Sequence, residues 1–135
     1  MLYRLVFVSD AAVPADHSTR SIAEILGASV TNNRRDEITG VMLFHRGQVA
    51  QIVEGARQDL DRLMTRLSRD DRHRRMTVLV DRPIVQRRHH HAMRLCPLAD
   101  RTLEATTGGR RLSDLGGAEI EALLSACDMP QASAA

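Results

Sequence analysis

Two short apolar segments separated by a turn are the feature that most restricts the fold of this chain of 135 residues. Residues 38–44 and 49–53 are joined by the polar linker His-Arg-Gly-Gln at 45–48. Apolar segments of this length on either side of a glycine-containing turn are typical of a β-hairpin, because Gly supplies the backbone conformation that the turn needs. The chain therefore contains an antiparallel strand pair, around which a sheet has to be built.

A glutamine, Gln51, lies in the middle of the second hairpin strand. Its side-chain amide carries two donors and an acceptor oxygen, and leaving such a group unpaired inside a protein costs about 1 to 3 kcal/mol. Solvent, neighbouring protein groups or a ligand can satisfy it, and a lone strand glutamine most often faces solvent or bonds locally. Two further amides, Asn32 and Asn33, precede the hairpin. We therefore treat these three residues as candidate binding groups.

Alternating patterns predict further strands on both sides of the hairpin. Residues 2–8 alternate, so that one face of this strand carries Tyr3, Leu5 and Phe7. Residues 76–80 predict a fourth strand, and residues 84–85 together with 92–95 predict a fifth. The sheet should therefore have four to five strands.

Helical spacing of apolar residues predicts two main helices and another near the C-terminus. The first begins at a Ser18 or Thr19 cap and ends near residues 32–33, and the second lies between residues 55 and 70. The apolar stripes of these two helices are formed by Ile22, Ile25, Leu26, Val30, Leu60, Leu63, Met64 and Leu67. The C-terminal helix carries on one face Ile120, Leu123, Leu124 and Cys127.

This order of elements predicts an α+β domain. We expect a ferredoxin-like βαββαβ sheet of four to five strands with two helices on one face, plus a C-terminal helical extension. In that arrangement the first and third strands in sequence are central neighbours. Residues 1–97 should form the main domain and residues 98–135 the extension, with a frayed tail from residue 128.

The predicted fold brings the amides to the face that the helices cover. A planar ligand between the two helices would meet Gln51 and the end of the first helix at its polar edge, where Asn32 and Asn33 offer complementary donors and acceptors. The helical pattern turns Ile25 and Leu67 inward. These two side chains would hold an aromatic ring between them.

Length and composition exclude several classes of protein. The chain has the size of one domain, has no apolar stretch near the roughly 20 residues of a membrane span, and starts without a signal-peptide pattern. We therefore expect a soluble, cytoplasmic protein without a membrane partner. All 19 basic residues are arginine, a bias typical of a GC-rich bacterial genome, and the formal net charge is only +2. Acidic and basic residues are interleaved, so nucleic acid is not an expected partner, and the arginine-rich patches at 72–75 and 87–88 should lie on solvated edges.

Cysteines and histidines lack the spacing of a metal site. Cys96 and Cys127 should be small buried residues without a disulfide. His89 and His91 would share one face of a strand, but zinc needs at least one further ligand, so we expect residues 89–91 to form an exposed edge. No phosphate loop, nucleophile motif or carboxylate pair marks an active site, and we expect no enzymatic activity.

Five pieces of sequence carry a family resemblance when they are taken together. They are the strand at 2–9, Asn32-Asn33 with Ile-Thr-Gly at 38–40, Gly-Gln-Val-Ala-Gln-Ile-Val-Glu-Gly at 47–55, Asp-Asp-Arg-His at 70–73, and Met93. In this combination they resemble the BLUF domain, a family of flavin-binding blue-light sensors, over about residues 2–95.

The resemblance implies that the chain binds FAD. By position, it implies that Asn33 bonds the carbonyl and imide edge of the isoalloxazine and that Asn32 also lines the flavin. Gln51 would contact the N5 and O4 edge and change its hydrogen bonds after excitation. The resemblance implies that the flavin wall is formed by Ser9, Ile25 and Leu67. It assigns the ribityl and phosphate end to Arg72 and His73, and signal relay to Met93.

One residue departs from the family pattern. Two positions before Ser9 the resemblance implies a tyrosine that gives an electron and a proton to the excited flavin and bonds the glutamine, but this chain has Phe7. Phenylalanine has no hydroxyl and is far harder to oxidise, so we expect an impaired or altered photocycle. Ile52 and His91 stand at or near positions where some members have tryptophan. Tyr3 is four residues from Phe7, about 13 Å along a strand, and is a poor substitute.

Two functions of different class remain open. The first is an FAD-binding BLUF-type blue-light sensor or regulatory protein that signals through protein contacts, with Phe7, Gln51, His91 and Met93 as signalling residues. The alternative is a degenerate BLUF-fold interaction module that binds no flavin or a different ligand. In both cases we expect an unknown downstream protein partner and a homo-oligomer, because the chain carries no appended effector domain.

Overall fold

The computed structural model describes residues 1–11, 19–70, 73–98 and 100–127. For residues 19–25, 73 and 100 it describes the backbone alone. Its elements in chain order are β1 (Leu2–Ala11), α1 (Thr19–Arg35), β2 (Thr39–His45), β3 (Gln48–Ala56), α2 (Arg57–Ser68), β4 (His73–Ile84), β5 (Arg94–Leu95), α3 (Asp100–Thr107), the 3₁₀ helix η1 (Leu112–Asp114) and α4 (Gly117–Cys127).

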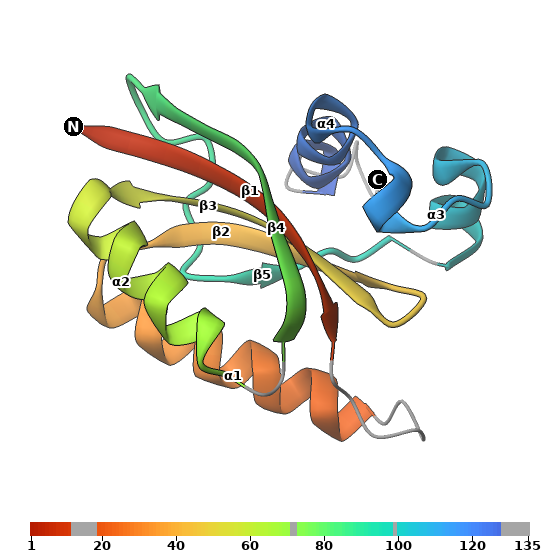
Figure 1. The fold of residues 1–135 in the computed structure, drawn as a ribbon, viewed down its shortest axis with the longest axis horizontal. Helices are drawn as coiled ribbons and strands as arrows, with labels where there is room; N and C mark the ends of the chain where they lie inside the picture. Colours follow the sequence, from red (N-terminus) through yellow and green to blue (C-terminus); the bar gives the residue numbers. More distant parts are fainter. Residues whose placement is uncertain (12–18, 71–72, 99, 128–135) are drawn as a thin grey trace, which may run out of the picture.

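The five strands form one mixed sheet in the order β4-β1-β3-β2-β5 (Figure 1). β1 pairs antiparallel with both β3 and β4, β2 pairs antiparallel with β3, and β5 pairs parallel with β2. The first and third strands are central neighbours, as predicted. The α+β, ferredoxin-like class with a C-terminal helical extension is therefore confirmed.

The β2–β3 hairpin depends on two glycines. Its two-residue turn, Arg46-Gly47, has positive φ at both positions, 51° and 75°. A type I′ turn requires this combination, and such a turn matches the twist of the flanking strands. Gly40 in β2 is needed for close approach, because a Cβ there would lie 2.1 Å from the backbone oxygen of Ile52.

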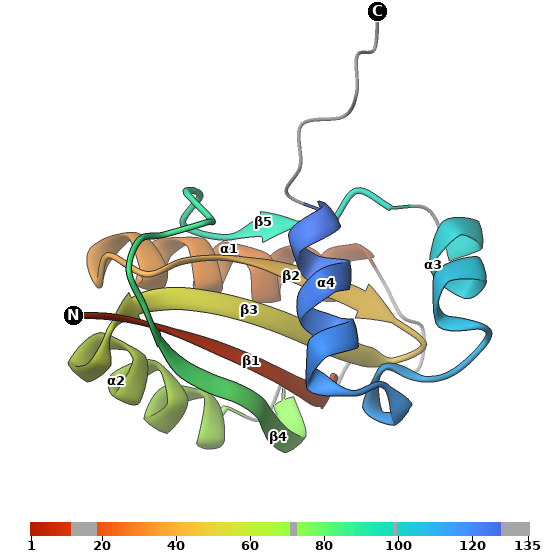
Figure 2. The ribbon, with the colours of Figure 1, turned by 90° about the horizontal axis from the view of Figure 1, so that it is seen from above.

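Successive strand residues point to opposite sides of the sheet. Since the central strands are apolar at successive positions, both faces of the sheet are apolar. α1 and α2 cover one face, as Figure 2 shows, and the cluster between them and the sheet includes Leu5, Phe7, Met42, Val53, Leu60 and Leu67. α4 covers the other face, as Figure 2 shows, where the cluster includes Val6, Val8, Ile52, Leu103 of α3, Leu112 of η1 and Leu124. We call these the α1/α2 face and the α4 face. The extension packs against the sheet and completes its second core.

The last two strands differ from their predicted bounds. β4 runs to Ile84, so this residue belongs to the fourth strand and not to the fifth, and Val85 is fully exposed. β5 contains only Arg94 and Leu95. The fourth strand is longer than its apolar pattern indicates because it pairs with β1 along nearly the whole of that strand.

The histidine run is not the exposed strand edge that we expected. His89 is fully buried, whereas His90 and His91 are exposed, and the three residues lie in an irregular segment. The Glu54 carboxylate draws this segment inward by accepting the backbone N–H of His89 at 2.8 Å. Within the described ranges, no group of three or more His, Cys, Asp or Glu side chains could hold a metal ion. No helix in that part of the chain is both long and apolar enough to cross a membrane.

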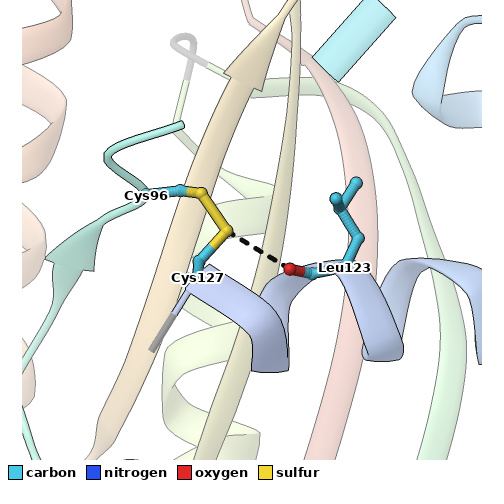
Figure 3. Close-up of a disulfide and its surroundings, with 3 residues drawn as sticks. All are labelled: Cys96, Leu123 and Cys127. Atoms are coloured by element: carbon cyan, nitrogen blue, oxygen red, sulfur yellow. Dashed lines mark hydrogen bonds between the residues drawn. A yellow bond between two sulfur atoms is a disulfide. The ribbon is translucent and has the colours of Figure 1, made fainter. Parts of the chain in front are cut away.

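The prediction of two unpaired cysteines is wrong. Cys96 and Cys127 form a disulfide, with their Cα atoms 5.1 Å apart, as Figure 3 shows. Cys96 follows β5, and Cys127 is the last residue of α4. The two residues are 31 positions apart in sequence. They meet only because α4 packs across the sheet, which no local pattern in the sequence reveals.

Candidate functional site

Gln51 occupies the middle of β3 and shares the α1/α2 face with its strand neighbours Val49 and Val53. Its direct cross-strand partners are Phe7 in β1 and Met42 in β2. The residue is 2% exposed, and its Nε2 atom has no hydrogen-bond partner among the described residues. The solvent-facing interpretation is therefore wrong, and a buried donor is left open.

Phe7 lies next to this donor but cannot pair with it. The ring is completely buried, directly opposite Gln51 in the β1–β3 pair, and carries no polar atom. Tyr3, farther along the same strand face, is half-buried and packs under the guanidinium of Arg57, whose Cζ lies 4.9 Å from the ring centroid. Tyr3 is thus a rim residue with a partner of its own.

Asn33 lies in the last turn of α1, which continues two residues beyond its predicted end. The side chain is 1% exposed, and its Nδ2 atom donates to the backbone oxygen of Ala92 at 2.8 Å. A carbonyl oxygen only accepts, so this bond fixes the orientation of the amide. The Oδ1 atom is buried and finds no hydrogen-bond partner in the described part of the chain. Asn33 therefore offers an open acceptor while it connects α1 to the segment before β5.

The remaining predicted wall residues are placed as follows. Ser9 is buried in β1, opposite Val49 of β3. Leu67 of α2 belongs to the apolar cluster on the α1/α2 face, and Asn32 is half-buried. The structure does not describe the side chain of Ile25, any part of Arg72 or the side chain of His73.

The segment that leads into β5 carries the two other predicted signalling residues, and the structure separates them. Met93 is 7% exposed and packs in the same cluster as Phe7. The side chain of His91 is exposed at the surface, while its backbone oxygen accepts the N–H of Gly40 at 2.9 Å. Met93 therefore lies on the site's face of the sheet, and the His91 side chain lies outside the core.

Glu54 holds this segment in place, although the sequence analysis gave it no role. Its side chain is fully buried, and Oε1 accepts the backbone N–H groups of Arg88 and His89, both at 2.8 Å. Oε2 accepts Nε and Nη2 of Arg4 at 2.8 and 2.6 Å, and Arg4 also donates to Glu121 of α4 at 3.0 Å. The one available signal was an acidic residue at the end of an apolar strand, which needs a partner when buried.

Arg87, which we expected on a solvated edge, is half-buried and makes specific hydrogen bonds. Its Nη1 atom donates to the backbone oxygen of Glu54 at 2.8 Å and to Oγ1 of Thr39 at 2.9 Å. Its Nη2 atom donates to the backbone oxygen of Glu37 at 2.7 Å. Glu37 has a positive φ of 56°, so the guanidinium stabilises an unusual turn between α1 and β2.

Asp36 connects the two helices that flank the α1/α2 face. It follows α1 and accepts hydrogen bonds from Arg35 at 3.1 Å and from Arg66 of α2 at 2.8 Å. These contacts, above all the one from Arg35, hold the pKa of the Asp36 carboxyl below its ordinary value, against the opposing effect of burial. The ion pair fixes the spacing of α1 and α2 at one end.

Gln51 Nε2 and Asn33 Oδ1, which we call the open amide atoms, define what the site can bind. One is a donor and the other an acceptor, and both are buried. Gln51 is held in β3, whereas Asn33 is held at the end of α1 through its bond to Ala92, just before β5. A planar heterocycle with a carbonyl oxygen and an imide N–H along one edge has the matching acceptor and donor. The donor and acceptor chemistry of these two amides therefore matches the polar edge of a flavin.

The fold and this pair of amides place the chain in the class of small ferredoxin-like α+β domains in which two helices cover one face of the sheet. Within that class, a family model described as sensors of blue light using FAD, the BLUF model, matches residues 2–94. The chain belongs to the BLUF family, as its sequence motifs indicate.

Individual relatives agree with this assignment. A photoactivated adenylate cyclase subunit beta-like protein of Euglena gracilis is 33% identical over 86 residues, which cover 64% of this chain and 10% of the relative. The chain thus spans about a tenth of the length of this curated relative. The dark-state structure of BlrB, a BLUF protein, superposes with a TM-score of 0.77 at 29% identity and covers 93% of both chains. The photo-activated state of BlsA superposes with a TM-score of 0.83 over both whole chains at 18% identity, which shows the fold alone.

Membership assigns the chain to a family of blue-light sensor modules that use FAD. A bacterial light-regulated adenylyl cyclase has a similar region at 28% identity, with a TM-score of 0.70, that makes up 42% of its chain. In that protein the BLUF-like region is therefore accompanied by other sequence.

Proposed function

We propose that this chain is an FAD-binding BLUF regulator that holds the flavin on the α1/α2 face and signals through protein contacts. The observation that carries the proposal is the pair of open amide atoms, Gln51 Nε2 and Asn33 Oδ1. A buried amide group without a partner costs about 1 to 3 kcal/mol. A domain that served only as a scaffold would be more stable with an apolar side chain at position 51, and it would gain nothing from the open Oδ1 of Asn33.

Different residues of the site would bind different parts of the cofactor. Asn33, oriented by the carbonyl of Ala92, would accept from the imide N–H of the flavin, and Gln51 would donate to a carbonyl oxygen at the same edge. The walls of the site would be formed by Ser9, Ile25, Asn32 and Leu67. The anionic end of the cofactor would be bound by Arg72 and His73. When bound, FAD supplies the absorption of blue light, which no side chain of this protein provides.

The light response should differ from the family pattern because of Phe7. The ring fills the position opposite Gln51 but offers neither a hydroxyl to bond nor an easily oxidised phenol. Tyr3 is about 13 Å along the strand and packs against Arg57. A cofactor at this site would therefore lack its usual tyrosine neighbour, so binding is expected and the usual photocycle is expected to be impaired.

The output would pass from the site to the surface of the cytoplasmic protein. Residues 1–97 would form the flavin-binding domain and residues 98–135 the helical extension, with Met93 and His91 relaying changes at Gln51 to an unknown downstream protein or to a second copy of the chain. An alternative follows from Phe7: a degenerate module that binds no flavin or a different ligand and acts by docking.

An absorption spectrum of the purified protein tests the proposal. After incubation with FAD and removal of free cofactor, the protein should retain flavin bands in the visible range. Asn33→Leu or Gln51→Leu should each weaken binding about tenfold, since one hydrogen bond of about 1.4 kcal/mol corresponds to that factor. Gln58→Leu, at an exposed position of α2, is the matched control and should bind normally. Absence of flavin bands in the reconstituted wild-type protein would favour the docking module instead.

A further inference from the structure

The disulfide joins the end of α4 to the segment that follows the edge strand β5, and both cysteines lie in the cluster on the α4 face. Cys127 ends α4, which covers the α4 face, and Cys96 follows β5 at the edge of the sheet (Figure 3). These are the only two cysteines in the chain. Within one molecule, therefore, these cysteines can form a single disulfide.

Cys96 is also closely connected to the candidate site. Its backbone N–H donates to the oxygen of Met42 at 2.8 Å, and Met42 is the cross-strand partner of Gln51. Met93, three residues before Cys96, packs on the site's face of the sheet. The disulfide thus attaches α4 to the strand next to the candidate flavin site.

α4 has a second attachment that does not depend on sulfur. Glu121 accepts from Arg4 at 3.0 Å and forms an ion pair with Arg82. Ile120 and Leu124 of the same helix are completely buried against the sheet. The helix is therefore held by packing and charge in its first two turns, and by the disulfide at its last residue.

The thiol form of Cys127 also fits the structure. Its Sγ atom lies 3.3 Å from the backbone oxygen of Leu123, one helical turn earlier (Figure 3). A disulfide sulfur carries no hydrogen, so this contact becomes an S–H···O hydrogen bond only after reduction. The reduced residue thus has an acceptor ready in the helix, and the same site accommodates both redox states.

We propose that Cys96–Cys127 is a thiol-responsive clasp that fastens the end of α4 to β5 when oxidised and releases it when reduced by a dithiol. One thiolate of the reductant attacks a cysteine sulfur, forms a mixed disulfide and expels the other cysteine as a thiolate. The second thiol of the reductant then closes its own disulfide, so that two electrons and two protons pass to the cysteines. The clasp goes beyond flavin binding and operates with or without cofactor.

The position of Cys127 determines how the exchange begins. Cys96 and Cys127 are 7% and 2% exposed, so a reductant reaches them only when the chain opens locally. Because Cys127 is the last helical residue of α4, unwinding one terminal turn is sufficient. The clasp is therefore expected to react slowly with small thiols and without unfolding the sheet.

Hydrogen exchange of backbone amides in the full chain tests the clasp. The oxidised and dithiol-reduced proteins are compared peptide by peptide, after alkylation and mass spectrometry have established the redox state of each sample. Reduction should speed exchange in the last turn of α4 by about tenfold or more and leave β1 and β3 within about twofold. A Cys96→Ser, Cys127→Ser variant should match the reduced wild type under both conditions. Glu121→Gln, which keeps both cysteines, should loosen the start of α4 but retain the difference between oxidised and reduced protein.

Three results would overturn the clasp. The first is free thiols at both positions after equilibration with oxidised glutathione. The second is equal exchange in α4 before and after reduction. The third is loss of protection in β1 and β3 on reduction, which would make the disulfide a global constraint on the fold instead of a local clasp. None of these outcomes depends on flavin, so the clasp and flavin binding can fail separately.

Discussion

Two glutamines in β3 allow a sharp test of why Gln51 is buried. Gln48 and Gln51 are both 2% exposed in the same strand, but they differ in partners. Gln48 donates to Oδ1 of Asp10 at 3.0 Å and accepts the backbone N–H of Ser113 at 3.0 Å. Gln51 has its Nε2 open among the described residues. Replacing each by leucine, which has a similar size, should therefore change stability in opposite directions.

The magnitudes follow from these contacts. Gln51→Leu removes an unpaired buried donor, whose cost is about 1 to 3 kcal/mol, and should stabilise the flavin-free protein by about 1 kcal/mol or more. Gln48→Leu loses two hydrogen bonds and leaves the Asp10 carboxylate and the Ser113 N–H without their partner, so it should destabilise by about 2 to 3 kcal/mol. For a chain of this size, 1 kcal/mol corresponds to roughly 3 to 5 °C in Tm.

Urea unfolding followed by far-UV circular dichroism measures both variants, since the chain has no tryptophan for fluorescence. The flavin-free proteins are compared first, and the measurement is repeated with excess FAD. A ligand that binds the folded state adds stability that grows with the logarithm of its concentration divided by Kd, so FAD should stabilise wild type and Gln48→Leu more than Gln51→Leu. Destabilisation of the flavin-free protein by Gln51→Leu would refute the reasoning, because it would mean that the amide contributes to the fold itself.

Three further predictions concern other parts of the same structure. Phe7→Tyr in flavin-loaded protein should restore a small red shift of the flavin band in the light-minus-dark spectrum, and an unchanged spectrum would show that other residues also disable the response. The pKa of Asp36 is lowered, so its contribution to folding stability is fully present above the ordinary carboxyl pKa of about 4 and is lost as the pH falls below that value. The unfolding free energy of Asp36→Asn should therefore depend less on pH in acid than that of wild type. Parallel curves for the two proteins would contradict the assignment. Glu54→Gln removes the fully buried one of the two carboxylates that pair with Arg4, leaves Glu121 in place, and should cost up to about 3 kcal/mol in urea unfolding. Glu121→Gln, at the rim of the same network, should cost clearly less, and equal losses would argue against a central role of Glu54.

Local patterns in the sequence were sufficient to predict most of the fold. The alternation of Tyr3, Leu5 and Phe7 against Val6 and Val8 predicted which side of β1 each residue occupies, and the structure places the two sets in different clusters. The same holds for the hairpin turn and for the helical stripe of α2. These features were predictable because they depend on residues that are neighbours in sequence.

The amides of the candidate site could be selected from the sequence, but their state could not. Gln48 and Gln51 are three residues apart in one strand, and nothing near them in sequence distinguishes an amide with two partners from one with an open donor. The partner of Gln48 in η1 is 65 residues away, and the partner of Asn33 before β5 is 59 residues away. Tertiary packing alone decides which buried groups are paired.

What the sequence by itself determined is the order of the main strands and helices, the two faces of β1 and the apolar stripe of α2, and the motifs of the BLUF family. Only the tertiary structure determined that Glu54 anchors the segment before β5, that His89 is buried, and that Cys96 meets Cys127. The physical reason is the same in each case: periodicity is a property of neighbouring residues, whereas the pairing of a buried charge, amide or thiol depends on elements that come together only when the whole sheet is covered on both faces.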